Sequence, residues 1–142
     1  MFIFPVASVF IEISFNKSNL SWPLIGKWFV FWAIGIRIFV AGIRQALNPE
    51  FTANEIFKIN NEKSLVVIRE LGFANICIGL IGILSLINTE WCKLGAIAGG
   101  LFLGLASIQH LSRKPDSKNE IIATISNAFI FVIMLLYLFE TI

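Results

Sequence analysis

The sequence predicts an all-α fold, a polytopic bundle of transmembrane helices. Hydrophobic residues fill 57% of the 142 positions and charged residues 14%, whereas soluble proteins carry about 25% charged residues. Such a chain has too little polar surface to cover itself in water, and a bilayer removes that requirement for most of its exterior. The composition therefore excludes soluble enzymes, nucleic-acid readers and secreted disulfide scaffolds, and the length predicts a single domain, residues 1–142.

Hydrophobic runs set the expected spans. A helix needs roughly 20 apolar residues to cross the hydrocarbon core, and four runs are that long. A fifth, near the N-terminus, is shorter and contains Pro5 and Glu12. It lacks the basic stretch and the cleavage site of a secretory signal, so we keep it in the chain and expect it to cross as well. The expected spans are residues 2–15, 24–43, 64–87, 91–111 and 121–139.

Basic residues orient the bundle, because short loops rich in lysine and arginine stay in the cytoplasm. One side holds six, Arg44, Lys58, Lys63, Arg113, Lys114 and Lys118, and the other holds three, Lys17, Lys27 and Lys93. The bias predicts that loops 45–63 and 111–118 are cytoplasmic in a protein of the cytoplasmic (inner) membrane. Aromatic residues near the opposite face indicate a belt at the outer interface: Trp22, Trp28, Trp32, Trp91 and Tyr137.

Two capping patterns occur next to the cytoplasmic loops. Thr52 and Glu55 have the spacing of a capping box, which predicts a short helix over about 53–59, lying on the membrane interface. Ser117 and Glu120 form a second capping box at the start of the last span. The simplest role for Glu120 is therefore that of a helix cap.

Glycine is confined to the three middle spans. Gly95 and Gly99, and again Gly100 and Gly104, are small-xxx-small pairs, which let helix backbones approach closely in lipid. We expect them to pack within one bundle rather than to form a dimer seam.

Four ionisable residues fall inside the spans: Glu12, Arg37, Arg69 and Glu70. Each costs about 2.5 to 3.5 kcal/mol near the bilayer centre, so each should face protein or water and find a partner. Arg37 and Glu70 both lie roughly 9 Å inside the cytoplasmic end of antiparallel neighbours, at 1.5 Å per residue. This predicts an ion pair between them.

Other polar groups reach the same layer, and together they predict a pocket in the cytoplasmic third of the bundle. Asn75 would be its floor and His110 its roof, and Gly72, Gly99 and Gly100 would make room for it. The alternative is that the polar groups satisfy one another and only fix the helix register. The candidate ligand-binding residues are Arg37, Arg44, Glu70, Asn75, His110 and Asn127.

The sequence assigns no catalytic residue and no metal site. His110 is the only histidine, and Cys77 and Cys92 form neither a metal-ligand pair nor a disulfide framework. We expect His110 to hydrogen-bond near the end of its helix. Enzymatic activity stays open, and a non-catalytic protein is favoured.

Several short motifs resemble the DoxX-like group of small bacterial and archaeal membrane proteins. They are Lys27-Trp-Phe-Val-Phe-Trp-Ala-Ile-Gly-Ile-Arg37, Ala41-Gly-Ile-Arg44, Arg69-Glu-Leu-Gly-Phe-Ala-Asn75 and Gln109-His110. The resemblance covers about residues 24–111 and implies a compact four-helix bundle in the cytoplasmic membrane. Some members of the group are linked to quinone-dependent sulfur oxidation or to thiol-stress complexes. The chain lacks a paired-cysteine redox motif, which argues against a direct thiol-oxidising role.

Three classes of function remain. The first is a redox-accessory or ligand-binding subunit that holds a quinone-like or other small amphiphile in the polar pocket. The second is an oligomeric channel or transporter with an Arg/Glu/His relay, although the inverted repeats and broken helices of many transporters are missing. The third is a structural or assembly subunit. We favour the first. The expected partner is the lipid bilayer, with a second copy or a partner membrane subunit left open, and the net charge of +2 gives no reason to expect nucleic acid.

Overall fold

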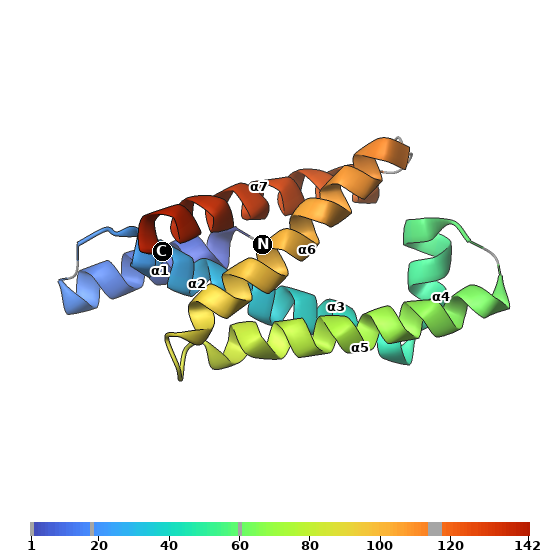
Figure 1. Ribbon diagram of the computed structural model, residues 1–142, viewed down its shortest axis with the longest axis horizontal. Helices are drawn as coiled ribbons and strands as arrows, with labels where there is room; N and C mark the ends of the chain where they lie inside the picture. Colours follow the sequence, from blue (N-terminus) through green and yellow to red (C-terminus); the bar gives the residue numbers. More distant parts are fainter. Residues whose placement is uncertain (1, 18, 60, 114–117) are drawn as a thin grey trace.

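The computed structural model describes residues 2–17, 19–59, 61–113 and 118–142, and every regular element among them is a helix. Within this described part, four helices are long and apolar enough to cross a membrane: Trp22–Leu47, Glu62–Leu84, Trp91–Arg113 and Glu120–Thr141. The fold is therefore the all-α bundle of transmembrane helices that the composition predicts (Figure 1).

The first long helix contains a wide turn in its middle. It consists of α2 (Trp22–Phe29), the π-helical segment η1 (Val30–Ile36) and α3 (Arg37–Leu47). Pro23 lies in the first turn of α2, where its missing N–H costs no hydrogen bond. π-Helical turns inside α-helices are rare and often occur at functional sites. Here the turn ends directly before Arg37.

Glycines bring this first long helix into backbone contact with α5 (Glu62–Leu84). A Cβ atom added to Gly82 would lie 2.5 Å from the Gly35 nitrogen, and one added to Gly42 would lie 2.7 Å from the Gly72 oxygen. No side chain fits between the two helices at these levels. α3 and α5 run side by side along one side of the bundle (Figure 1).

The other side of the bundle is formed by α6 (Trp91–Arg113) and α7 (Lys118–Thr141). The glycines of α6 pack inside this chain, as expected: Gly99 lies against Ile34, and Gly100 lies against Met134. Gly72, Gly99 and Gly100 therefore serve contacts between helices. None of the three lines the polar cavity described below, contrary to expectation, and Gly100 borders a smaller apolar hollow between α6 and α7.

α1 (Ile3–Asn16) lies beside the beginning of the first long helix and is too short to be a fifth span. Its 14 residues extend about 21 Å at 1.5 Å per residue, against roughly 30 Å of hydrocarbon. The ring of Phe2 meets that of Phe129, half-way along α7, at a centroid distance of 4.8 Å. α1 therefore reaches about half the depth of the bundle. The sequence-based expectation of a fifth crossing does not hold.

Hydrogen bonds from the first long helix hold α1 in place. Lys27 Nζ lies 2.8 Å from a Glu12 carboxylate oxygen, and the Trp28 indole donates to the same oxygen at 2.7 Å. The Trp32 indole donates to Ser8 Oγ at 3.0 Å. These two tryptophans thus hold a neighbouring helix, and Tyr137 is buried. The aromatic belt at the outer interface, which also includes Trp22 and Trp91, stays a prediction.

The loop after α3 folds into α4 (Pro49–Thr52), continued by η2 (Ala53–Phe57). Asn48 is the N-cap, because its side-chain oxygen accepts a hydrogen bond from the Phe51 N–H at 3.3 Å. The predicted start at Thr52 was therefore wrong by one turn, and Pro49 occupies the first helical position. The other capping residue, Ser117, lies outside the described residues.

Candidate ligand-binding cavity

A cavity of about 540 Å³ lies at the end of the bundle where α3, α4 and η2 meet α5, α6 and α7. Its size falls within the range of about 300 to 1,000 Å³ that is typical of small-molecule sites. Ten apolar residues line it: Ile38, Val40, Ala41, Phe51, Ile56, Phe57, Leu71, Phe102, Leu103 and Ala106. The polar lining residues are Arg37, Arg44, Gln45, Thr52, Asn75, Gln109, His110, Arg113 and Asn127.

Arg37 lies at the buried end of the cavity, directly after η1. One of its terminal nitrogens, Nη2, donates to Asn127 Oδ1 at 2.5 Å and to Ser126 Oγ at 3.2 Å. The other, Nη1, is buried and has no hydrogen-bond partner among the described residues. The guanidinium is therefore held on one side by α7 and lacks a partner on the other.

Asn75 is the second buried polar residue of this lining, with 3% of its surface exposed. Its Nδ2 donates to Gln45 Oε1 at 2.7 Å, which joins α5 to α3. Its Oδ1 is buried and, within the described residues, has no partner. Native proteins leave few buried polar atoms unsatisfied, so such an atom at a cavity is available to bind water or a ligand. Both unsatisfied side-chain atoms found in the described part of this chain belong to cavity residues.

Two arginines and two aromatic rings line the more exposed part of the cavity. The Arg44 guanidinium carbon lies 3.5 Å from the ring centroid of Phe51, and that of Arg113 lies 5.8 Å from the ring centroid of Phe57. Such cation–π contacts tie α4 and η2 to α3 on one side and to α6 on the other. The loop after α3 therefore folds over this end of the bundle as a cover of the cavity.

His110 and Glu120 close the bundle beside the cavity. His110 Nδ1 lies 3.0 Å from Glu120 Oε1, and both side chains are largely buried. One turn further along α7, the Thr124 carbonyl accepts a hydrogen bond from Ser107 Oγ at 3.2 Å. Glu120, Thr124 and Asn127 therefore share the inward face of α7, and His110 is hydrogen-bonded near the end of its helix.

Glu70 does not belong to this site. It is exposed on the outer face of α5 together with Arg69 and Phe73, and it does not line the cavity. Within the described part of the chain, no ion pair joins Glu70 to Arg37, so that prediction was wrong. The physical reason is angular: Gly72 faces α3, and a residue two positions away on an α-helix points about 200° from it. Depth differs as well: Gly79 packs on Phe39, whereas Gly72 packs beside Gly42 and Ala46, so Glu70 lies nearer the end of the bundle than Arg37.

The structure brings the other five predicted residues to one cavity: Arg37, Arg44, Asn75, His110 and Asn127. The sequence interpretation missed Gln45, Thr52 and Ser126. Gln45 follows Arg44 directly and Ser126 precedes Asn127, so the signal available for both was adjacency to a predicted site residue. Thr52 could not be found this way, because its place depends on how the loop folds back.

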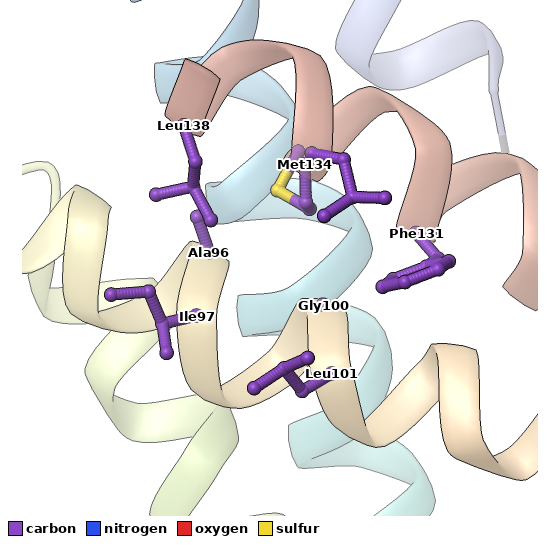
Figure 2. Close-up of a pocket in the computed structure, with 8 residues that line it drawn as sticks. Ala96, Ile97, Gly100, Leu101, Phe131, Met134 and Leu138 are labelled. Carbon is purple, nitrogen blue, oxygen red and sulfur yellow. The ribbon is translucent and has the colours of Figure 1, made fainter. Parts of the chain in front are cut away.

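A second, smaller hollow of about 170 Å³ lies between α6 and α7. Figure 2 shows Phe131 and Met134 of α7 around it, together with Ala96, Ile97 and Gly100 of α6. All its lining side chains are apolar, so it offers no group that could orient a polar ligand. In the described residues, no three histidine, cysteine or acidic side chains come together as metal ligands.

Comparison with protein families finds one family model that covers nearly the whole chain. A model described as "Family of unknown function (DUF6790)" matches residues 1–140. The chain belongs to the DUF6790 family. No curated protein and no solved structure matches it. The match covers every helix of this DUF6790 protein that contributes to the cavity.

Proposed function

We propose that this DUF6790 protein binds a small amphiphilic molecule within the membrane, with the polar head of that molecule at Arg37 and Asn75. The supporting observation is that Arg37 Nη1 and Asn75 Oδ1 are buried and unsatisfied at one cavity. A ligand that offers both an acceptor and a donor would satisfy them. A quinone-like molecule meets both needs in its reduced, quinol form, whose hydroxyl groups donate and accept, and in that case the protein would act as a redox-accessory or ligand-binding subunit.

The shape and lining of the cavity support this proposal. Buried residues such as Ile38, Leu103 and Asn127 form its inner part, whereas Val40, 57% exposed, lies at its margin on the outside of α3. A lipid-soluble molecule could enter from the side and leave its chain among the apolar walls. A purely structural polar layer would instead have its donors and acceptors paired with one another.

We further propose that the protein resides in the cytoplasmic membrane, with loops 45–63 and 111–118 on the cytoplasmic side. The six-to-three bias in basic residues supports this orientation. The contact between Arg113 and Phe57 joins the two loop regions at one end of the bundle. The cavity would then lie in the cytoplasmic half of the membrane. The DoxX-like motifs are consistent with that location.

A cavity-filling substitution tests the binding proposal. Ala106 lines the cavity, whereas Ala74 is exposed on α5 and does not. Decylubiquinone and dodecanol should raise the melting temperature of the purified protein in neutral detergent micelles, because a ligand that binds only the folded state stabilises it. Ala106→Phe should abolish the shift, and Ala74→Phe should preserve it.

Glu70→Gln serves as a second control and should also bind normally, because Glu70 lies outside the cavity. If neither neutral nor anionic amphiphiles raise the melting temperature, or if the two phenylalanine variants respond alike, the binding proposal is wrong. A structural role would then be the better interpretation of the polar layer.

A further inference from the structure

We infer that the head group this cavity accepts is anionic and carries a hydroxyl, as a phosphate monoester on a hydrocarbon chain does. This inference rests on the proposed function, since it names the chemical class of the amphiphile. It differs from the quinone-like ligand, whose head is neutral. Three features of the cavity carry it: the partners of Arg37, the charges of the lining and the acceptor on Asn75.

The first feature is that Arg37 has only neutral partners. Its Nη2 is bound by a hydroxyl and an amide oxygen, and the described residues place no carboxylate on either nitrogen. A buried charge without a counter-ion is strongly destabilising, and neutral hydrogen bonds compensate it only in part. An anion on Nη1 would satisfy the free donor and neutralise the guanidinium at the same time. A neutral carbonyl would satisfy only the donor.

The second feature is that all the described charged residues lining the cavity are positive. Arg37, Arg44 and Arg113 all line the cavity, and no aspartate or glutamate is among its described lining residues. Glu120, the nearby carboxylate, lies against His110 instead. A concave site with charges of one sign and low-dielectric walls concentrates ions of the opposite sign. Arginine is also the side chain whose geometry best fits the oxygens of phosphate and carboxylate groups.

The third feature is that Asn75 Oδ1 is an unsatisfied acceptor and therefore needs a donor. A phosphate monoester carries both an anionic oxygen and, with its second pKa near 6, an O–H group in part of the population. It can thus accept from Arg37 and donate to Asn75. A carboxylate has no such donor. The apolar walls, among them Phe102 and Leu103, favour a phosphate joined to a hydrocarbon chain over inorganic phosphate.

Four probes separate these requirements: dodecyl phosphate, dodecanoate, dodecanol and inorganic phosphate, each titrated into the full-length protein in neutral micelles. We expect dodecyl phosphate to bind at least about tenfold more tightly than dodecanol, since tenfold is 1.4 kcal/mol and a charged hydrogen bond exceeds that. Dodecanoate should fall between them. Inorganic phosphate should neither bind nor compete.

Arg37→Gln should remove the preference for dodecyl phosphate, so that the phosphate and dodecanol bind with similar, weak affinity. Arg69→Gln is the matched control, because Arg69 is exposed on α5 and does not line the cavity. It should leave the preference unchanged, and it corrects for anionic probes that adhere to the micelle surface. If Arg37→Gln does not fold, the wild-type preference and its loss in Ala106→Phe decide the question.

The outcomes distinguish the two proposals. Equal affinities for dodecyl phosphate and dodecanol, both abolished by Ala106→Phe, would overturn the anionic head group and keep the binding function. Absence of binding by every amphiphile would overturn both. Competition by inorganic phosphate would overturn the requirement for a hydrocarbon chain on the ligand. Equal affinities for dodecanoate and dodecyl phosphate would overturn the role given to Asn75.

Discussion

Arg37 on α3 and Asn127 on α7 are 90 positions apart in the chain and are joined by a hydrogen bond of 2.5 Å. This bond fixes one side of the guanidinium against α7 and leaves the other side at the cavity. The contact therefore has two consequences: it links the two sides of the bundle, and it sets the direction of the buried positive charge.

Removing Asn127 should destabilise the protein through this bond. We expect Asn127→Ala to lower the free energy of unfolding by about 1 to 3 kcal/mol, because it leaves a charged donor with a single remaining partner. Asn54→Ala, at an exposed position on η2, should cost much less. The double variant with Arg37→Met should be less destabilised than the sum of the two single variants. Additive costs in equilibrium unfolding would show that the two side chains are not coupled.

The glycine contacts between η1 and α5 should tolerate no added methyl group. A Cβ on Gly82 would meet the backbone nitrogen of Gly35 at 2.5 Å, whereas one on Gly95 would meet only a side-chain methyl of Val30 at 2.8 Å. Overpacking typically costs about 1 to 3 kcal/mol, and more where backbone must move. We expect Gly82→Ala to lower the melting temperature clearly more than Gly95→Ala. Equal shifts would contradict the close backbone approach.

Attachment of α1 should depend on pH. The hydrogen bond from Lys27, with further help from Trp28 and the charge of Lys27, lowers the pKa of Glu12 below its usual 4.5, although partial burial opposes this. A lowered folded-state pKa stabilises the docked helix above the unfolded-state value and loses that contribution as the pH falls through the folded-state value. Acidification below about pH 4.5 should therefore loosen α1 and change the fluorescence of Trp28.

Glu12→Gln should remove this pH dependence, while Glu140→Gln, an exposed position near the C-terminus, should retain it. An acid-induced change of the same size in Glu12→Gln would show that another group is responsible.

The orientation of the bundle can be read by cysteine labelling. Lys58→Cys should react with a membrane-impermeant maleimide only after the membrane is opened, because the basic bias places loop 45–63 inside. The background should carry Cys77→Ser, since Cys77 is exposed, whereas Cys92 is buried. A cysteine at Asn88, in the turn at the opposite end of α5, should react from outside. The reverse pattern would invert the proposed orientation.

Hydrophobic runs were enough to predict the four long helices, and the positions of polar residues along them were enough to predict the end of the bundle that carries the polar layer. They also placed Arg37, Asn75 and His110 in that layer, because depth along a helix follows directly from residue count. Depth is one coordinate of a side chain, and direction is the other. The Arg37 and Glu70 prediction ignored direction, and its depth estimate was also wrong, because Gly72 packs beside Ala46 and only Gly79 reaches Phe39.

The buried face of α5 could nevertheless have been predicted from the sequence. Its buried residues Ile68, Gly72, Asn75, Gly79 and Gly82 recur at helical spacing, and Glu70 falls outside that series. The fold of α4 and η2 over the cavity was harder to predict, because it depends on Asn48 as a cap and on contacts with distant arginines. No short-range pattern reports those contacts.

The π-helical segment η1 has a consequence for length changes in this chain. A π-helical turn amounts to one residue inserted into an α-helix, and one residue corresponds to about 100° of rotation. The wide turn absorbs this extra residue, so deleting a single residue from Val30–Ile36 would let the segment relax into an ordinary α-helix with Arg37 still directed at the cavity. A deletion of one residue within α2, where no residue is extra, would instead turn Arg37 by about 100° relative to the start of the helix.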